Sequence, residues 1–294
     1  MKIFITGGSG LLGQYLNVTL GKQHCILTQF FSNAENCKDF NSVHLSLTDH
    51  ISLKKIFDEF KPEVVIHCAS ISNAEKVDKA LPSFAYDVNV NATKRIAELC
   101  SDHDAKLIYF STDLVYAGYR GSMLNEDAKL NPISFYAETK LMGEIKIQET
   151  FNNYIILRTA LLYGFGLNQS LNHFQFAFKD LKNGKPVKLF TDQFRTPLEV
   201  SDSARMISDL LQSNISCEVL NFGGKDRLSR FQLLELVCEE AGFDKNLLIA
   251  TTMDEVGLSY KVADVSMNTD KLKSFGVEAI NAREAIKRIL SQQL

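Results

Sequence analysis

A glycine-rich segment near the start of the chain, Thr6-Gly7-Gly8-Ser9-Gly10-Leu11-Leu12-Gly13, constrains the fold more than any other feature. It follows a β-branched, apolar run that is typical of a buried parallel strand, and it opens a stretch with helical periodicity. In this setting one glycine makes a tight turn, a second lets the backbone approach a phosphate, and a third lets the helix pack closely on the strand. The helix N-terminus adds free N–H groups and a partial positive charge. We therefore expect a Rossmann-type dinucleotide site that begins at the first residue.

Strand-like and helix-like segments alternate after this loop, which indicates βαβ units and a doubly wound parallel sheet. The regularity loosens near residue 160, so we expect a cofactor-binding domain over 1–160. Residues 161–294 are expected to form a smaller, mainly substrate-binding α/β annex, with some segments returning to the sheet. Ser201 and Asp202 are candidate helix caps. The expected strands are 3–5, 25–31, 64–69, 106–110, 154–157 and 219–222, and the expected helices are 11–20, 51–60, 83–101, 134–151, 174–181, 200–211, 229–241 and 282–290.

Composition excludes several classes of protein. The formal charge is −3 with no basic stripe, which argues against nucleic acid as a partner. No apolar stretch approaches 18 residues, and the N-terminal apolar run is too short for a signal peptide, so we expect a cytoplasmic protein without a membrane partner. The six cysteines form no C-x-x-C pair and suggest no metal site. Several, such as Cys25, lie in apolar runs and are expected to be small buried residues in a reducing compartment.

The segment after the second expected strand, Gln29-Phe30-Phe31-Ser32-Asn33, bears on which cofactor is bound. A NAD site usually has an acid here that binds the ribose hydroxyls. Because that acid is missing, a 2′-phosphate meets no repulsion, although no arginine is present to attract it. We therefore expect NADP(H) to be preferred, with NAD(H) as the alternative.

Tyr136 and Lys140 are four residues apart in a helical stretch, which places both on one helix face. They are the only Y-x-x-x-K pair in the chain, and they follow the strand that ends in Ser111-Thr112-Asp113. Reduction of a carbonyl needs a proton donor, and tyrosine, with a reference pKa near 10, serves best when a cation lowers that value. We expect Tyr136 to be the donor, Lys140 the cation, and Thr112 the group that holds the substrate oxygen.

Nine motifs give the chain a resemblance to the extended short-chain dehydrogenase/reductase superfamily, and within it to the dTDP-4-dehydrorhamnose reductases. The motifs are TGGSGLLG (6–13), PEVVIHCAS (62–70), VNVNAT (88–93), STDLVYAG (111–118), YAETK (136–140), LRTALLYG (157–164), TDQFRTPLEVSD (191–202), LNFGG (220–224) and NTDKLKSFG (268–276).

The resemblance implies a role for each matching residue. The glycine set becomes Gly7, Gly10 and Gly13, with Gly8 in a supporting place. Asn89 supports the turn at residues 68–70, and the segment from 172 to 195 lines a nucleotide-sugar pocket. The implied catalytic residues are Thr112, Tyr136 and Lys140, and the implied substrate contacts are Thr112, Asp113, Asn172 and Arg195. The implied cofactor contacts are Gly7, Ser9, Gly10, Leu11, Leu12, Gly13, Ser32, Cys68, Ala69, Ser70, Asn89, Ser111, Tyr136 and Lys140.

Three departures from the family pattern affect the substrate more than the fold. Ser46 stands where an acid usually contacts adenine, residues 67–70 read His-Cys-Ala-Ser instead of Asn-Ala-Ala, and residues 262–264 lack an Arg-Pro pair. The implied activity is NADPH-dependent reduction of the 4-keto group of a nucleotide-activated deoxysugar, in dTDP-rhamnose biosynthesis. An epimerase or dehydratase is the alternative within the superfamily. Leu114 after Asp113 argues against the dehydratase, which has a second acid there.

A non-catalytic role is also open, because the fold resembles the NADP-binding regulatory β subunit of methionine adenosyltransferase. We expect a monomer or homodimer whose partner is a nucleotide sugar.

Overall fold

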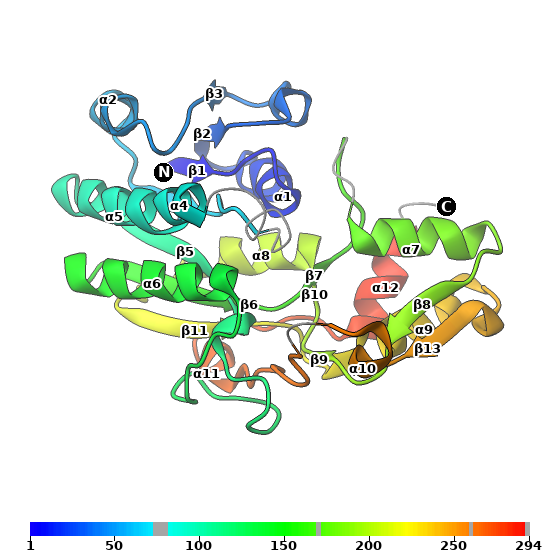
Figure 1. Cartoon of the computed structure of the whole chain (residues 1–294). Coiled ribbons are helices and arrows are strands. Elements are labelled where there is room, and N and C mark those ends of the chain that lie inside the picture. The colour runs from blue at the N-terminus through cyan, green and yellow to red at the C-terminus, as the bar shows by residue number, and fades with distance from the viewer. Residues whose placement is uncertain (73–81, 169–171, 259–260, 292–294) are drawn as a thin grey trace.

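The computed structural model describes residues 1–72, 82–168, 172–258 and 261–291. Seven strands of these residues form one parallel sheet in the order β3-β2-β1-β4-β5-β6-β11, which confirms the expected Rossmann-type α/β fold (Figure 1). The strand order reverses between β1 and β4, and ligands of such sheets bind at this reversal. The strands are β1 (Lys2–Thr6), β2 (Cys25–Phe30), β3 (Ser42–His44), β4 (Val64–His67), β5 (Lys106–Thr112), β6 (Tyr154–Thr159) and β11 (Glu218–Phe222).

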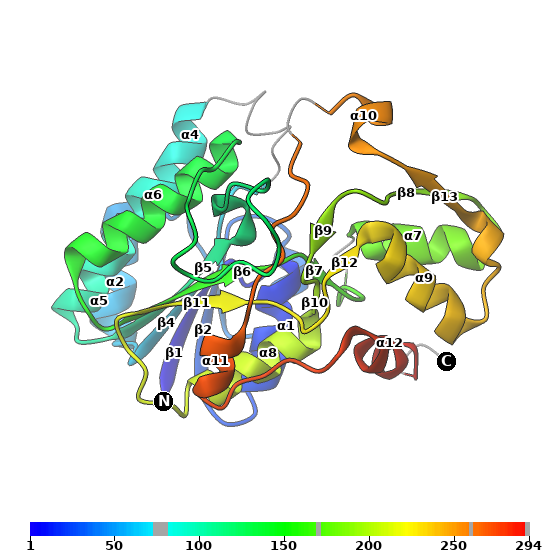
Figure 2. The same cartoon turned by 90° about the horizontal axis from the view of Figure 1, so that it is seen from below.

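Helices cover both faces of the sheet because its strands are apolar on both sides. In β1, Ile3 and Ile5 belong to one core cluster and Phe4 belongs to the other. The first face carries α1 (Leu11–Leu20) and α8 (Val200–Leu210), whose residues share the cluster of Ile3. The second face carries α2 (His50–Phe60), α5 (Ala92–Asp102) and α6 (Phe135–Thr150), and Figures 1 and 2 show these helices on the opposite side from α1 and α8.

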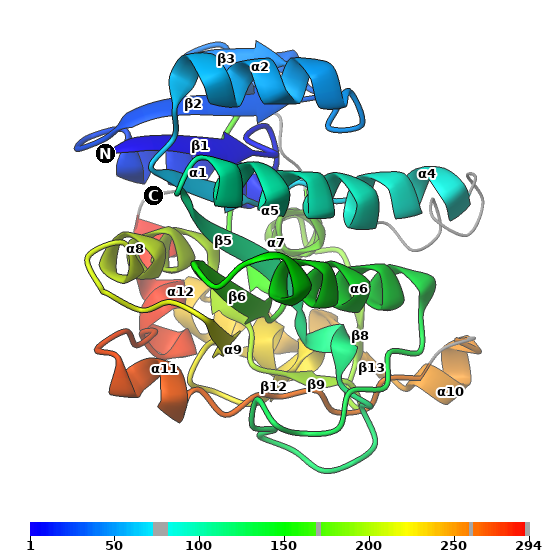
Figure 3. The ribbon, with the colours of Figure 1, turned by 90° about the vertical axis from the view of Figure 1, so that its left-hand side faces the viewer.

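The helix expected over 83–101 is not one regular α-helix. The short α4 (Pro82–Tyr86) runs into a π-helical turn over Asp87–Asn91, and α5 then continues the same rod, as Figure 3 shows. The Ala92 N–H donates to the Asp87 carbonyl five residues earlier, so one extra residue is fitted into the turn. Such π turns are rare and often occur at functional sites. No periodicity in the sequence distinguishes this turn from ordinary helix.

The second half of the chain builds a smaller unit beside the sheet, with its own apolar core, and also contributes α8 and β11 to the sheet layers (Figure 2). Its elements are β7 (Leu162–Tyr163), α7 (His173–Lys182), β8 (Val187–Phe190), β9 (Phe194–Arg195), β10 (Leu198–Glu199), β12 (Leu228–Ser229), α9 (Arg230–Ala241), β13 (Leu248–Thr251), α10 (Met253–Val256) and α12 (Ala282–Ser291). The short α11 (Asp270–Ser274) packs on β11, and its Leu272 belongs to the core cluster of the sheet. Three 3₁₀ turns, Ala34–Cys37, Asp113–Val115 and Lys245–Leu247, complete the described elements.

Two local expectations were wrong. Helix α8 is capped by Glu199, whose carboxylate accepts the Ser201 and Asp202 N–H groups, because those two residues already lie in the first turn. Cys25 is exposed, since it begins β2 at the edge of the core, whereas Cys37, Cys100 and Cys238 are buried as expected. No helix of the described residues has the length and apolar character needed to cross a bilayer.

Candidate active site

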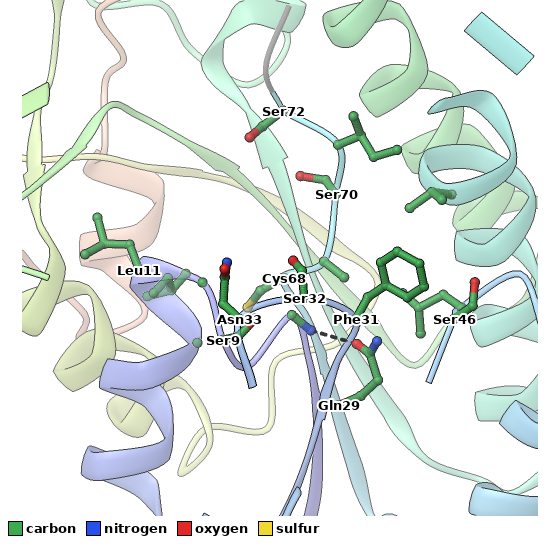
Figure 4. Close-up of a pocket in the computed structure, with 18 of the residues that line it drawn as sticks. Ser9, Leu11, Gln29, Phe31, Ser32, Asn33, Ser46, Cys68, Ser70 and Ser72 are labelled. Carbon is green, nitrogen blue, oxygen red and sulfur yellow. Dashed lines mark hydrogen bonds between the residues drawn. The ribbon is translucent and has the colours of Figure 1, made fainter. Parts of the chain in front are cut away.

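The glycine loop lies between the ends of β1 and β4, where it forms the floor of a cavity of about 410 Å³. Gly7 has φ +73°, and its N–H donates to the side-chain oxygen of Gln29 at 3.0 Å (Figure 4). A Cβ on Gly7 would lie 2.7 Å from the backbone nitrogen of Ala69, so only glycine allows the two loops to meet here. Gly8 does not line the cavity. Instead, its N–H donates to the Gln29 carbonyl and supports the loop from behind.

Helix α1 begins at this cavity without a side-chain cap. Gly10 is its N-cap residue, no acidic side chain lies in its first turn, and Leu11, Leu12 and Gly13 line the cavity. The N–H groups of a first helical turn lack partners within the helix and carry partial positive charge. A cradle of glycine backbone below a free helix N-terminus fits the pyrophosphate of a dinucleotide.

The far wall of the cavity comes from the segment after β2. Ser32 lines it as expected, together with Phe31, Asn33 and Ser46 (Figure 4). Phe31 is 57% exposed, so its ring offers a flat apolar surface at the end where an adenine would lie. No charged side chain of the described residues lines this cavity, which agrees with the missing acid noted in the sequence. Gln29, Phe31 and Asn33 were not expected as lining residues.

The turn from Cys68 to Ser70 forms the third wall, and a buried polar chain holds it in place. The Ala69 N–H donates to the Thr6 hydroxyl at 3.3 Å, and that hydroxyl lies 2.6 Å from Nδ1 of His67. On the other side of the ring, Nε2 lies 2.9 Å from the Thr93 hydroxyl, which donates its own proton to the Asn89 carbonyl. Nε2 must therefore carry the imidazole proton, and Nδ1 accepts the proton of Thr6. Burial lowers the pKa of His67 to about 3, so the ring is neutral at physiological pH.

Asn89 acts behind the cofactor cavity and does not line it. Its side chain is buried in the π turn, where its oxygen accepts the Ile71 N–H at 2.9 Å and its amide donates to the Ile71 carbonyl and to Thr139. Because these bonds are made within the protein and Asn89 does not line the cavity, the geometry gives it a supporting place, and its expected direct contact with the cofactor stays a prediction. The expected support of the turn at residues 68–70 agrees with this geometry.

A second cavity, of about 400 Å³, opens next to the first and shares Leu12, Cys68, Ser70 and Ser72 with it. Thr112, Asp113 and Tyr136 line it, so the structure brings three of the expected catalytic and substrate residues together. Tyr136 lines this second cavity together with Ser70, one of the residues that the two cavities share. The neighbouring hydroxyls of Ser70 and Thr112 act to lower the pKa of its phenol.

The pKa of Tyr136 differs from the value expected from the sequence. Burial, followed by the negative charge of Asp113, raises the pKa of Tyr136 to about 12, whereas we expected Lys140 to lower it. Lys140 lines neither cavity. Its ammonium lies 4.0 Å from the centre of the Tyr109 ring, and burial lowers the pKa of Lys140 to about 7. The helical spacing was right, but it could not reveal how deeply each side chain is buried.

Two arginines and one carboxylate form the other end of the second cavity. Nη1 of Arg195 lies 2.7 Å from Oδ1 of Asp113, and both side chains are largely buried, so this is not a surface salt bridge. Oδ2 of Asp113 is buried without a hydrogen-bond partner among the described residues. Arg230 was not expected here. Its pKa is lowered by burial and by the neighbouring charge of Arg195, and its Nε donates to Gln193.

Two expected ligand contacts are used elsewhere. Asn172 lies at the N-terminus of α7, where its oxygen accepts the Gln175 N–H and its amide donates to the Gly164 carbonyl, and it lines neither cavity. Ser111 lines the second cavity and not the first, and its hydroxyl donates to Glu144, so its expected contact with the cofactor stays a prediction. Within the described residues no cluster of metal-ligating side chains occurs.

Similarity to a known protein family extends over the whole chain. The model of the RmlD substrate binding domain family matches residues 1–294. A probable low-salt glycan biosynthesis reductase, Agl14, of Haloferax volcanii is 28% identical, with 87% of this chain and 85% of the relative covered. The dTDP-4-dehydrorhamnose reductase of Aggregatibacter actinomycetemcomitans is 26% identical, with 98% of both chains covered. The methionine adenosyltransferase 2 subunit beta of Xenopus tropicalis is also 26% identical, with 94% and 83% covered.

Solved structures show the same fold. The dTDP-4-dehydrorhamnose reductase of Bacillus anthracis, crystallised with NADP, superposes with a TM-score of 0.86 at 23% identity, covering 100% of this chain and 99% of that one. The Bordetella bronchiseptica enzyme WbmG, crystallised with NAD, gives a TM-score of 0.85 at 24% identity, covering 99% and 93%.

Proposed function

Because the chain belongs to the RmlD substrate binding domain family, we propose that it is an NAD(P)-dependent reductase of a nucleotide sugar. The substrate would be the 4-keto group of a nucleotide-activated deoxysugar, as for the dTDP-4-dehydrorhamnose reductases that it resembles. NADP(H) is the preferred cofactor and NAD(H) an alternative, in keeping with a cavity that has no acid to repel a 2′-phosphate. The observation that carries this proposal is that Tyr136 lines the second cavity together with Ser70, which also lines the cofactor cavity.

When bound in the first cavity, a nicotinamide cofactor would be the source of the hydride for the carbonyl carbon, and the chain would supply the proton. With a pKa of about 12, Tyr136 keeps its proton at neutral pH and can give it to the oxygen that becomes a hydroxyl. Thr112, which lines the same cavity as Tyr136, would hold that oxygen in place. Lys140, a buried cation four residues along the helix, would stabilise the phenolate that remains.

Arg195 and Arg230 are proposed to bind the diphosphate of the nucleotide sugar. Two guanidinium groups and a single carboxylate, that of Asp113, line this end of the cavity, and the carboxylate pairs with Arg195, so the end has an excess of positive charge. Arginine suits this task because its planar fork can bind phosphate oxygens in pairs. The free Oδ2 of Asp113 would accept a hydrogen bond from a sugar hydroxyl.

Residues 1–160 would bind the cofactor and residues 161–294 mainly the substrate. In support, every lining residue of the first cavity lies before residue 89, while the second cavity adds Arg195 and Arg230. We also propose a cytoplasmic location, which is supported by six free cysteines.

The test is NADPH oxidation with a panel of dTDP-4-keto-6-deoxyhexoses, comparing wild type with Tyr136→Phe. We expect the wild-type protein to oxidise NADPH with these sugars. In Tyr136→Phe the turnover should fall at least about 100-fold, as for removal of a general acid. Tyr119→Phe is the matched control, because Tyr119 is 64% exposed and lines neither cavity.

The chain is a regulatory partner if the wild-type protein oxidises NADPH with none of the keto sugars and binds a methionine adenosyltransferase catalytic subunit tightly. Near-normal turnover of Tyr136→Phe would instead remove Tyr136 from the reaction while leaving the reductase activity in place.

A further inference from the structure

A buried ion pair between Glu144 and Arg158 lies behind the candidate active site. Nη2 of Arg158 is 2.9 Å from Oε2 of Glu144, and the two side chains are only 6% and 2% exposed. Neither residue lines either cavity. A buried pair of this kind is weak evidence for stability, because desolvation of the two charges offsets much of their attraction. Its position therefore suggests another role.

The pair joins the elements that carry the catalytic residues. Glu144 lies on α6 four residues after Lys140, one turn along the same face. Its carboxylate also accepts a hydrogen bond from the hydroxyl of Ser111, the residue directly before Thr112 at the end of β5. Arg158 lies on β6, the neighbour of β5 in the sheet. One carboxylate thus connects Thr112 on its strand with Tyr136 and Lys140 on their helix.

Arg158 is fixed by further hydrogen bonds, so it cannot turn away from Glu144. Its Nη1 donates to the Tyr116 hydroxyl at 3.1 Å and to the Glu126 carbonyl at 2.8 Å. The Tyr116 hydroxyl in turn donates to the side chain of Asn221 at 2.6 Å. The network therefore extends from α6 through β6 to β11, and it holds the Glu144 carboxylate at a fixed place.

The groups around Lys140 leave Glu144 as the source of negative charge. Burial raises the pKa of the Cys68 thiol, so Cys68 is neutral at physiological pH, and His67 is neutral as well. Tyr136 and Tyr109 also have raised pKa values and present a neutral phenol and a ring face. Burial lowers the pKa of Lys140 to about 7, and the negative charge of Glu144 opposes that effect.

We propose that Glu144 is a positioning residue that fixes Ser111 and Thr112 against the catalytic helix and supplies the negative charge that keeps Lys140 a cation. Its consequence for turnover rests on the proposed reductase function. Its effect on Lys140 is a property of the protein without ligand and can be measured separately.

The test follows the titration of Lys140 by NMR in protein labelled with ¹³C-lysine, where the Lys140 signal is identified by its loss in Lys140→Met. In Glu144→Gln, which keeps the shape and a hydrogen-bond acceptor for Ser111, we expect the pKa of Lys140 to fall by at least about one unit. Glu149→Gln is the matched control, since Glu149 lies on the same helix and pairs with Lys146 at the surface. It should leave the titration unchanged.

If Glu144→Gln leaves Arg158 uncompensated and does not fold, the double variant Glu144→Gln/Arg158→Met takes its place. It should shift the Lys140 titration in the same direction by a smaller amount, because the opposing charge of Arg158 is also removed. An unchanged titration in the folded variant would overturn the proposal.

The activity profile gives an independent readout. The protonated form of Lys140 is the active one, so kcat/KM should fall as the pH is raised through the pKa of Lys140. In Glu144→Gln this fall should begin at a lower pH than in wild type. The difference in pH should equal the change in the Lys140 pKa that NMR measures. A shifted titration in a protein that reduces no keto sugar would refute the reductase function and still support the assignment of Glu144 to Lys140.

Discussion

Alanine at Gly13 and alanine at Gly10 should damage the protein in different ways, although the two glycines belong to one loop. A Cβ on Gly13 would lie 2.6 Å from the Cα of Gly8 and 2.9 Å from its carbonyl carbon. These are backbone atoms that cannot move aside, so α1 would have to shift away from β1. Because Leu12, Leu16 and Leu20 of α1 pack in the main core, we expect Gly13→Ala to cost about 2–3 kcal/mol of unfolding free energy.

Gly10 presents the opposite case. It has φ −74° and ψ 169°, which any residue can adopt, and a Cβ there would meet a single neighbour, the Gly7 carbonyl oxygen at 3.2 Å. We expect Gly10→Ala to cost less than about 1 kcal/mol of stability. The added methyl would occupy the place where the backbone approaches the pyrophosphate, so the affinity for NADPH should fall at least about tenfold, or about 1.4 kcal/mol.

Urea unfolding and NADPH fluorescence titration, applied to both variants, separate the two effects. Gly184→Ala is the control, because Gly184 has open space around it and lies outside both cavities. Its φ of +67° makes it a measure of backbone strain alone. The reasoning is wrong if Gly13→Ala unfolds like wild type, or if a stable Gly10→Ala binds NADPH as tightly as wild type does.

Two further predictions concern charge. His67 has a folded pKa of about 3 and an unfolded value near 6.5, so the unfolded chain takes up a proton first as the pH falls. The contribution of His67 to stability should therefore be constant above pH 6.5 and should fall by about 1.4 kcal/mol per pH unit below it. Urea unfolding at several pH values should show a shallower slope in His67→Gln, and identical slopes would contradict the assignment. Arg195→Gln should raise the KM for the nucleotide sugar by at least about tenfold, the loss expected for a charged hydrogen bond, without changing the Kd for NADPH. An unchanged KM in steady-state kinetics would place the diphosphate elsewhere.

The parts of the site that the sequence predicted are those encoded within a short segment. The glycine loop lies between one strand and the next helix, and Tyr136 and Lys140 lie on one helix face. Their spacing in the sequence was therefore enough to predict these placements. Arg230 and Glu144 were missed because their roles depend on contacts between distant segments, which no local pattern reports. Asn172 is different: an asparagine directly before an apolar-periodic helix is a capping signal, and that signal was available in the sequence.

The expected direction of the Tyr136 pKa was wrong for a related reason. Spacing on a helix tells which side chains are neighbours, but the pKa depends on how much water each one has lost and on charges from other strands. Burial raises the pKa of Tyr136 most, and the negative charge of Asp113, which directly follows β5, raises it further. The same limit applies to the π turn at 87–91, because its hydrogen bonds differ from those of an α-helix while its apolar pattern does not.

The place of β11 in the sheet has a consequence for how the chain is made. When residues 1–160 have emerged from the ribosome, β6 has no neighbouring strand on its outer edge. At that stage α1 also lacks α8, which shares its core cluster. A bare strand edge and an uncovered apolar helix face are the features that lead nascent chains to aggregate. The sheet is completed only after residue 222 has been synthesised, so residues 1–160 lack β11 and α8 until the later half of the chain has been made.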